Sequence, residues 1–276
     1  MFSRSRIEYK KPDQIRQMRR AGLVVADIHA AIRGAAVPGV STAELDAVAA
    51  AVLQQAGARS NFLGYHGFPA HVCLSVNDEV VHGIPSERVL QPGDVLSADC
   101  GAVVEGWHGD AAFSMVLQEA EAADVELVQT TEAAMWAGIA ALAGAERLGE
   151  VGDAVQAEVE RRTAGGPALS IVTEYVGHGI GSAMHQPPDV LNIASSNRGP
   201  KIRPGLCVAI EPMVTRGTAE TRVLADDWTV VTTDASRAAH SEHTVAVHSG
   251  GIWVLTAPDG GAGQLAARGV RVAPLD

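Results

Sequence analysis

Two stretches of similar sequence constrain the fold of this chain more than any other feature. "VPGVSTAELDAVAAAVLQQAGA" begins at Val37, and "AERLGEVGDAVQAEVERRTAGG" begins at Ala145. A helix-like segment precedes each stretch and strand-rich sequence follows it, so the order helix, helix, strands occurs twice. We therefore predict an α+β fold of one domain within residues 1–276. Its two pseudo-symmetric halves, about residues 12–122 and 123–255, would join their sheets, with the helices on one face. A functional cleft is expected where the halves meet.

Local signals define the elements of each half. Pro12 opens a helical stretch, and Ser41 or Thr42 is the expected N-cap of a second helix that has Glu44 in its first turn. The second half repeats this order from about Ala123. Strands are expected in Val72–Leu117, with turns at Pro92-Gly93 and Glu105-Gly106, and in Ser170–Val176, Leu206–Val214, Trp228–Thr232 and His243–Val247.

Charge and cysteine content exclude several classes of function. The formal net charge of −11 argues against binding to nucleic acid or to an anionic membrane, because both favour basic patches. No apolar run is long enough to span a membrane, and the charged start of the sequence lacks the apolar core of a secretory signal. Cys73, Cys100 and Cys207 form no CxxC pair, which excludes a cysteine-rich zinc module. Their odd number fits a reducing compartment, so we expect a cytoplasmic protein.

Two aspartates interrupt an otherwise apolar hairpin, "VLSADCGAVVEGWHGDAAFSMV". Asp99 follows an alternating strand, and Asp110 lies on the next strand. If the chain turns near Val104–Gly106, the two side chains lie opposite each other across an antiparallel hairpin. Each aspartate taken alone is a common turn residue beside a glycine. Two carboxylates held together, however, repel each other unless one is protonated or a cation lies between them.

Three further segments place acidic or imidazole groups in apolar surroundings. Glu211 ends the strand in "LCVAIEPMV", Glu242 begins the strand in "HSEHTVAV", and His178 supplies an imidazole. Glu211 alone could be a solvated strand end, and Glu242 could simply pair with a neighbouring base. Four carboxylates at the inner ends of apolar strands would nevertheless be costly to desolvate without a countercharge. The pattern therefore predicts a metal site, and its ligand types suit two ions of Mn²⁺, Fe²⁺, Co²⁺ or Zn²⁺.

A glycine-rich ribbon, "EYVGHGIGSAMHQPP", carries His178 and His185. Glycine forfeits packing and costs backbone entropy, so it marks close backbone approach or an unusual φ/ψ. The simplest interpretation is a loop with two solvated imidazoles. The alternative is a site in which His178 meets the four carboxylates. A nucleotide site is excluded, because no phosphate-loop Lys-Ser/Thr follows the glycines.

Long motifs distributed along the chain point to one enzyme family. In order they are "GYHGFP", "CLSVNDEVVHGIP", "DCG…HGDAA", "GHGIG…HQPP", "EPM" and "SEHT". From about Pro12 to Leu255 the sequence resembles the type I methionine aminopeptidases, in their short bacterial form, of peptidase family M24. The resemblance implies the pita-bread fold, a curved, mainly antiparallel sheet with helices on its outer face. It also implies removal of the initiator methionine from nascent proteins by dinuclear-metal-assisted hydrolysis, with a small second residue preferred.

The resemblance assigns the metal ligands. Asp99 would bind one divalent cation, and His178 and Glu211 would bind the other. Asp110 and Glu242 would bridge both. The cations would be Co²⁺, Mn²⁺, Fe²⁺ or Zn²⁺, and Glu211 would also act as the general base.

The resemblance implies two catalytic histidines and a side-chain pocket beside the metal ions. His82 and His185 would contact the scissile peptide without binding metal. The sequence departs from the family pattern at Phe62, Phe68 and Met184, where relatives often have Cys, Tyr and Phe. A methionine-sized apolar slot is still expected. Its lining would be Tyr65, Phe68, Cys73, Met184 and Trp228.

Three alternative functions can be weighed against this one. X-Pro aminopeptidases and prolidases resemble this catalytic part but carry a large N-terminal domain that this sequence does not show. A metal-free pita-bread peptide-binding protein would have lost ligands, whereas all five are present. A serine hydrolase acting through Ser182 would need a GxSxG motif. The expected partners are peptides with N-terminal methionine and nascent chains near the ribosome, bound by a monomer.

Overall fold

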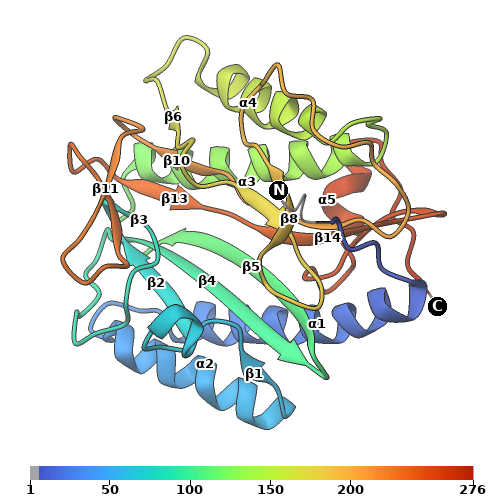
Figure 1. Cartoon of the computed structure of the whole chain (residues 1–276). Coiled ribbons are helices and arrows are strands. Elements are labelled where there is room, and N and C mark those ends of the chain that lie inside the picture. Colours follow the sequence, from blue (N-terminus) through green and yellow to red (C-terminus); the bar gives the residue numbers. More distant parts are fainter. Residues whose placement is uncertain (1–5, 276) are drawn as a thin grey trace, which may run out of the picture.

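The strands of the molecule lie between two pairs of helices (Figure 1). The structure is a computed structural model that describes residues 6–275. Helices α1 (Pro12–Ala35) and α2 (Thr42–Ala56) cover one side, and α3 (Ala122–Leu142) and α4 (Gly149–Thr163) cover the other. A short helix, α5 (Ala262–Ala266), follows the last strand.

The sheet of the first half is built around a long hairpin. Strand β4 (Val95–Val104) pairs with β5 (Trp107–Val116) on one side and with β1 (Arg59–Ser60) and β2 (Val72–Val76) on the other. The expected turn at Glu105-Gly106 is confirmed, and both residues have positive φ, 50° and 82°. Such two-residue turns match the twist of antiparallel strands. A single helical turn, η1 (Tyr65–Gly67), connects β1 to β2.

The second half contains a five-stranded sheet in the order β15-β14-β9-β7-β8. Two smaller sheets flank it, in the orders β13-β10-β6 and β11-β12-β3. All the strand pairs in residues 6–275 are antiparallel, so the predicted α+β class with a mainly antiparallel sheet is confirmed. The bounds of these strands are β3 Glu79–Val81, β6 Ser170–Ile171, β7 Gly177–Gly179, β8 Gln186–Val190, β9 Cys207–Ile210, β10 Met213–Thr215, β11 Thr221–Val223, β12 Val230–Thr232, β13 Ala238–His240, β14 His243–His248 and β15 Gly251–Val254.

Backbone hydrogen bonds join the halves at the centre of the molecule. The N–H of Ala112 on β5 donates to the carbonyl of Glu242 (3.2 Å), and the N–H of Glu242 donates to the carbonyl of Ala112 (2.9 Å). Strand β3 of the first half also pairs with β12 of the second.

The strands nevertheless form four separate hydrogen-bonded sheets and not one unbroken sheet. The expected strand Leu206–Val214 is divided at Pro212, since proline has no N–H for a ladder.

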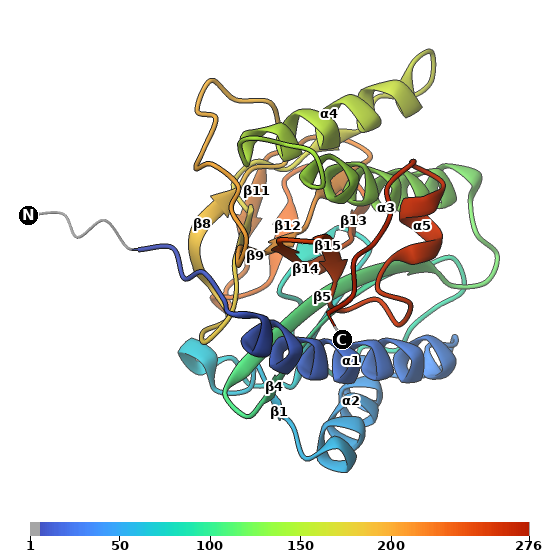
Figure 2. The same ribbon diagram turned by 90° about the vertical axis from the view of Figure 1, so that its right-hand side faces the viewer.

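Each half has its own hydrophobic core between its helix pair and its strands. The core of the first half includes Ile28 and Ile32 of α1, packed against Leu96 and Phe113 of the hairpin. Helix α1 runs along β4 and β5 (Figure 2). Gly109 on β5 permits this contact, because a Cβ there would lie within 3.0 Å of the backbone of α1. The helix and the hairpin are therefore in direct backbone contact at this point.

Three local findings complete the fold. Ser41 is the N-cap of α2, as predicted. Its hydroxyl accepts from the N–H of Glu44, and the carboxylate of Glu44 accepts from the N–H of Ser41, which forms a capping box. The three cysteines are buried and free. Among residues 6–275, no helix is both long and apolar enough to cross a membrane.

Candidate active site

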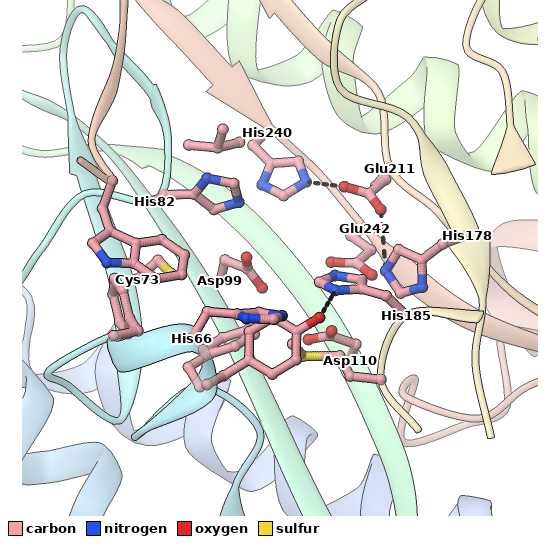
Figure 3. A pocket seen from close by; sticks show the side chains of 16 residues that line it. His66, Cys73, His82, Asp99, Asp110, His178, His185, Glu211, His240 and Glu242 are labelled. Atoms are coloured by element: carbon pink, nitrogen blue, oxygen red, sulfur yellow. Dashed lines mark hydrogen bonds and ion pairs between the residues drawn. The ribbon is translucent and has the colours of Figure 1, made fainter. Parts of the chain in front are cut away.

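A cavity of about 310 Å³ opens where the two halves meet, and side chains from both halves line it (Figure 3). One side, which we call the acidic wall, consists of carboxylates and imidazoles. The other side, the apolar wall, consists of aromatic and sulfur-containing side chains. The acidic wall contains Asp99, Asp110, His178, Glu211, His240 and Glu242, and the apolar wall contains Phe62, Tyr65, Phe68, Cys73, Met184 and Trp228.

The hairpin of the first half supplies two carboxylates of the acidic wall. Asp99 pairs with Ala112, and Asp110 pairs with Gly101. The aspartates are therefore diagonal neighbours on one face, and the prediction that they lie directly opposite each other is wrong. The two-residue turn at Glu105-Gly106 sets this register. Diagonal neighbours still reach a common ligand, because their side chains leave the same face of the hairpin.

The second half supplies its carboxylates from two adjacent strand ends. Glu211 follows β9 directly, and Glu242 directly precedes β14. Because Ile210 pairs with His243, the two glutamates lie at the same end of neighbouring antiparallel strands. Thr244 ties this end to the hairpin: its hydroxyl donates to the carbonyl of Asp110 (2.7 Å) and accepts from the N–H of Asp110 (3.1 Å).

The glycines around His178 allow its strand to fit between two others. A Cβ on Gly177 would lie within 3.0 Å of the Ala209 carbonyl, and one on Gly179 would meet the Pro187 carbonyl just as closely. The close approach predicted from the glycines is thus between neighbouring strands. His178 Nδ1 lies 3.0 Å from the Gly179 carbonyl, and its Nε2 lies 3.4 Å from Glu211 Oε1. Donation from Nδ1 to the carbonyl leaves the Nε2 lone pair free for a cation.

The polar atoms of the acidic wall are buried without enough partners. In the described part of the chain, eight buried side-chain atoms lack a hydrogen-bond partner, and four belong to this wall. These four are Asp99 Oδ1, Asp110 Oδ1, His240 Nε2 and Glu242 Oε1. A buried polar atom without a partner costs about 1–3 kcal/mol, so this concentration favours a bound cation.

The pKa values of the carboxylates are shifted upwards. Burial raises the pKa of Asp99 to about 7 and that of Glu211 to about 8. Burial, together with the charges of the neighbouring carboxylates, raises the pKa of Asp110 and that of Glu242 well above their ordinary ranges. Burial lowers the pKa of His178 to about 3, so this imidazole is neutral and can donate its lone pair. The wall therefore resists its own ionisation and favours a bound cation.

Two sets of three side chains in this wall could each hold a metal ion. The first is Asp110, His178 and Glu242, and the second is Glu211, His240 and Glu242. The ligand atoms within each set lie within 4.8 Å of one another. Oxygen and imidazole donors of this kind fit a divalent transition metal. His240 was not among the predicted site residues, although its place two residues before Glu242 puts both on one face of an extended segment.

Two more histidines face the cavity beside the acidic wall. The ring of His185 lies edge-on to that of His178, 4.4 Å between centroids, and its Nδ1 is 2.8 Å from the Tyr65 hydroxyl. His82 has a positive φ of 60° and contacts the rings of Tyr175 and Trp228. Burial lowers the pKa of His82 to about 4 and also lowers the pKa of His185.

The apolar wall forms a separate hydrophobic cluster. Phe68 contacts Trp228 edge to face, with ring centroids 5.1 Å apart, and Cys73 and Met184 are buried beside them. All five residues expected in the pocket belong to this cluster. His66 also lines the cavity and was not predicted.

A second cavity, of about 450 Å³, adjoins the first. His82, His178, His185 and Glu211 line both cavities. These four side chains therefore stand between the cavity with the two walls and a larger groove beside it.

Comparison with known proteins places the chain in a family. Residues 16–249 match the model of metallopeptidase family M24. The chain is 48% identical to methionine aminopeptidase 1 of Mycobacterium tuberculosis over 91% of this chain and 95% of that protein. It is 41% identical to methionine aminopeptidase 1 of Bacillus subtilis, over 90% and 98% of the two chains.

Solved structures agree with this placement. The methionine aminopeptidase of Thermotoga maritima is 35% identical and superposes with a TM-score of 0.87, over 91% of this chain and 99% of that one. The prolidase of Pyrococcus furiosus, 17% identical, shares the fold with a TM-score of 0.70 over 91% of this chain and 66% of its own. The predicted pita-bread fold is confirmed. The chain belongs to metallopeptidase family M24, and its relatives at 41–48% identity are methionine aminopeptidases.

Proposed function

We propose that this metallopeptidase hydrolyses the first peptide bond of proteins that begin with methionine, preferring a small second residue. The observation that carries the proposal is the contact between the two walls: an apolar slot without a charged side chain opens onto a buried set of carboxylates. The slot suits an unbranched thioether, which bends to fit and contacts aromatic rings favourably. The names of the close relatives support the same activity.

Two divalent cations, of Mn²⁺, Fe²⁺, Co²⁺ or Zn²⁺, would be held by Asp99, Asp110, His178, Glu211 and Glu242. When bound, such cations polarise a carbonyl and make water acidic enough to attack it at neutral pH. Glu242 belongs to both sets of potential ligands, which supports its assignment as a bridging residue. The bridging role of Asp110 is supported by its place in one set of potential ligands with Glu242 and by its electrostatic interaction with Asp99.

The remaining chemistry falls to three side chains. Glu211 acts as general base, because its carboxylate lies at the junction of the two cavities and burial raises its pKa to about 8. It takes a proton from the attacking water and returns it to the leaving amine. His82 and His185 line the same junction and stabilise charge that develops on the scissile carbonyl. The Tyr65 hydroxyl orients the imidazole of His185 through its hydrogen bond to Nδ1.

The shape of the site supports release of a single residue. The methionine side chain would lie against the apolar wall, and the free α-amine would lie near Asp99 at the closed end. The chain beyond the scissile bond would leave through the adjoining groove. The rings of His178 and His185 narrow the junction, which supports the preference for a small second residue.

Residues 1–276 would act as one catalytic domain, with halves of about residues 12–122 and 123–255. We propose that it works as a monomer in the cytoplasm on nascent chains near the ribosome. The net charge of −11 disfavours direct binding to RNA, so any such contact would be with protein.

A comparison of two peptides after metal removal tests the activity. The protein is treated with a chelator, and Co²⁺ or Mn²⁺ is then added back. We expect cleavage of Met-Ala-Ser to disappear and return with metal, while Ala-Pro peptides stay intact. Cleavage of Ala-Pro in preference to Met-Ala-Ser would instead assign the chain to the X-Pro peptidases, whose fold it shares. Metal-independent or absent cleavage of both peptides would refute the proposal.

A further inference from the structure

The backbone of His240 is held in place by both halves of the molecule. Its N–H donates to the hydroxyl of Ser114 (2.9 Å), and that hydroxyl donates to the His240 carbonyl (2.8 Å). Ser97, paired with Ser114 across the hairpin, completes the network at 2.7 Å. On its other side His240 pairs with Met213 of β10. Such a network fixes the direction of a side chain before any ligand arrives.

The imidazole of His240 points at two carboxylates (Figure 3). Its Nε2 lies 3.6 Å from Glu211 Oε2, which is too long for a hydrogen bond. This Nε2 is buried without a hydrogen-bond partner. Nitrogen and oxygen donors that bind the same ion at ~2.1 Å, with an angle of about 120° between them, are separated by about this distance. A cation between the two side chains would satisfy both.

Glu211 presents one oxygen to each of two imidazoles. Oε1 lies 3.4 Å from His178 Nε2, and Oε2 lies 3.6 Å from His240 Nε2. The two sets of potential ligands share Glu242 and differ in their imidazole. The carboxylate of Glu211 therefore lies between two nitrogen donors.

We propose that His240 is a sixth metal-binding residue, a direct imidazole ligand of the cation held by Glu211 and Glu242. The inference rests on the dinuclear centre of the proposed function and changes its ligand set. The cation that the resemblance assigns to His178 and Glu211 then has two imidazoles, from His178 and from His240. Imidazole suits Fe²⁺, Co²⁺ and Zn²⁺ better than Mn²⁺, so His240 shifts the preference of its position away from Mn²⁺.

Metal binding by His240→Asn and His240→Ala tests this assignment. Asparagine keeps polarity but does not reach the position of Nε2. The matched control is His82→Asn, because His82 is a half-buried histidine of the same cavity whose ring contacts are aromatic. Each metal-free protein is titrated with Co²⁺ by calorimetry, and X-ray absorption counts the imidazoles per bound cobalt ion.

We expect wild type and His82→Asn to bind two ions with an average of one imidazole each. In the His240 variants we expect an average of one half imidazole per bound ion. Loss of a group that only orients a ligand costs ~10–100-fold in metal affinity, so loss of a direct ligand should weaken one of the two ions by about 100-fold or more.

Several outcomes would overturn the inference. One is an unchanged imidazole count in a His240 variant whose circular dichroism matches wild type. Another is a weakening of about 10-fold with the count retained, which would make His240 a positioning residue acting through Glu211. If both variants fail to fold, the wild-type count still decides, because one half imidazole per ion contradicts a second histidine ligand. None of these measurements uses peptide cleavage, so a wild type that binds metal as expected but spares Met-Ala-Ser would refute only the proposed function.

Discussion

Asp110 in the acidic wall and Phe68 in the apolar wall are buried to the same degree, yet burial has opposite consequences for the two side chains. Asp110 is 3% exposed and Phe68 is 2% exposed. Burying a phenylalanine stabilises the fold by about 1.5–3 kcal/mol. Burying a carboxylate without a partner destabilises it, and the raised pKa values of the acidic wall express that cost. An apolar wall is thus indistinguishable from ordinary core, whereas an acidic wall identifies a functional site.

Substitution of a shared carboxylate should have the largest effect. Asp110→Asn and Glu242→Gln each remove a ligand assigned to both cations, so we expect loss of metal-dependent hydrolysis. Calorimetric titration should show metal affinity falling by more than the ~10–100-fold typical of an outer-shell partner. Phe68→Leu, a change of the opposite wall, is the matched control and should bind metal normally. Unchanged stoichiometry and affinity in either acidic-wall variant would show that its carboxylate does not bridge.

The histidines between the walls should affect the rate without affecting metal content. We expect His82→Ala and His185→Ala to retain both cations and to lose about 10²-fold or more in kcat, as removal of a transition-state hydrogen bond does. Tyr65→Phe should lose less than His185→Ala, because the imidazole remains and only its orientation weakens. Elemental analysis and steady-state kinetics check both points. A histidine variant that has lost metal would have to be reassigned as a ligand.

The hairpin shows how much of the site local sequence could predict. The Glu105-Gly106 turn and the alternation around it were sufficient to place Asp99 and Asp110 on one face. The predicted pairing would need a turn at Val104-Glu105, whereas the Glu105-Gly106 turn pairs Asp99 with Ala112 and makes the two aspartates diagonal neighbours. The Ser41 cap was predictable for the same reason: its partners lie within four residues along the chain.

His240 shows what local sequence could not provide. Its position depends on Ser114 from the other half and on pairing with β10, and neither contact follows from the residues around it. The division of Leu206–Val214 could have been foreseen from Pro212, which cannot donate to a ladder. Glu211 and His240 are far apart in the sequence, so their proximity could be seen only in the structure.

Metal removal should expose the electrostatic cost of the acidic wall. In the unfolded chain Glu has a pKa of about 4.3, whereas burial raises that of folded Glu211 to about 8. Between these values the folded state binds more protons than the unfolded state. The free energy of unfolding of the metal-free protein should therefore fall as the pH rises, up to about pH 8. From pH 6.8 to 8 His178 and His82 contribute little, since the unfolded pKa of histidine is about 6.5 and burial makes their folded pKa lower still.

Thermal unfolding at pH 6.8 and 8.0, with chelator and with Mn²⁺, measures this effect. We expect a lower Tm at pH 8.0 for the metal-free protein and a smaller or reversed difference with metal bound. Glu211→Gln is the matched control, because it removes one titrating group, and its metal-free form should depend less on pH. Equal pH dependence of the two metal-free proteins would show that the Glu211 carboxyl titrates normally in the fold.

The smallest effect concerns the apolar wall and the choice of the first residue. Tyr65, Phe68, Cys73, Met184 and Trp228 form a slot without a charged group, so a leading Lys, Glu or Asp would be desolvated without a partner. Norleucine keeps the length and flexibility of methionine. A whole methylene changes the free energy of binding in an apolar pocket by ~1–3 kcal/mol, so this near-isosteric replacement should reduce kcat/KM by less than about 10-fold.

Peptides that begin with leucine-like residues should be cleaved more slowly but still detectably, because buried Met184 is flexible enough to adjust to their shape. The measurement is kcat/KM on peptides that differ only at residue one. Cleavage of a leading Lys or Glu as fast as methionine would mean that the first side chain binds elsewhere than on the apolar wall.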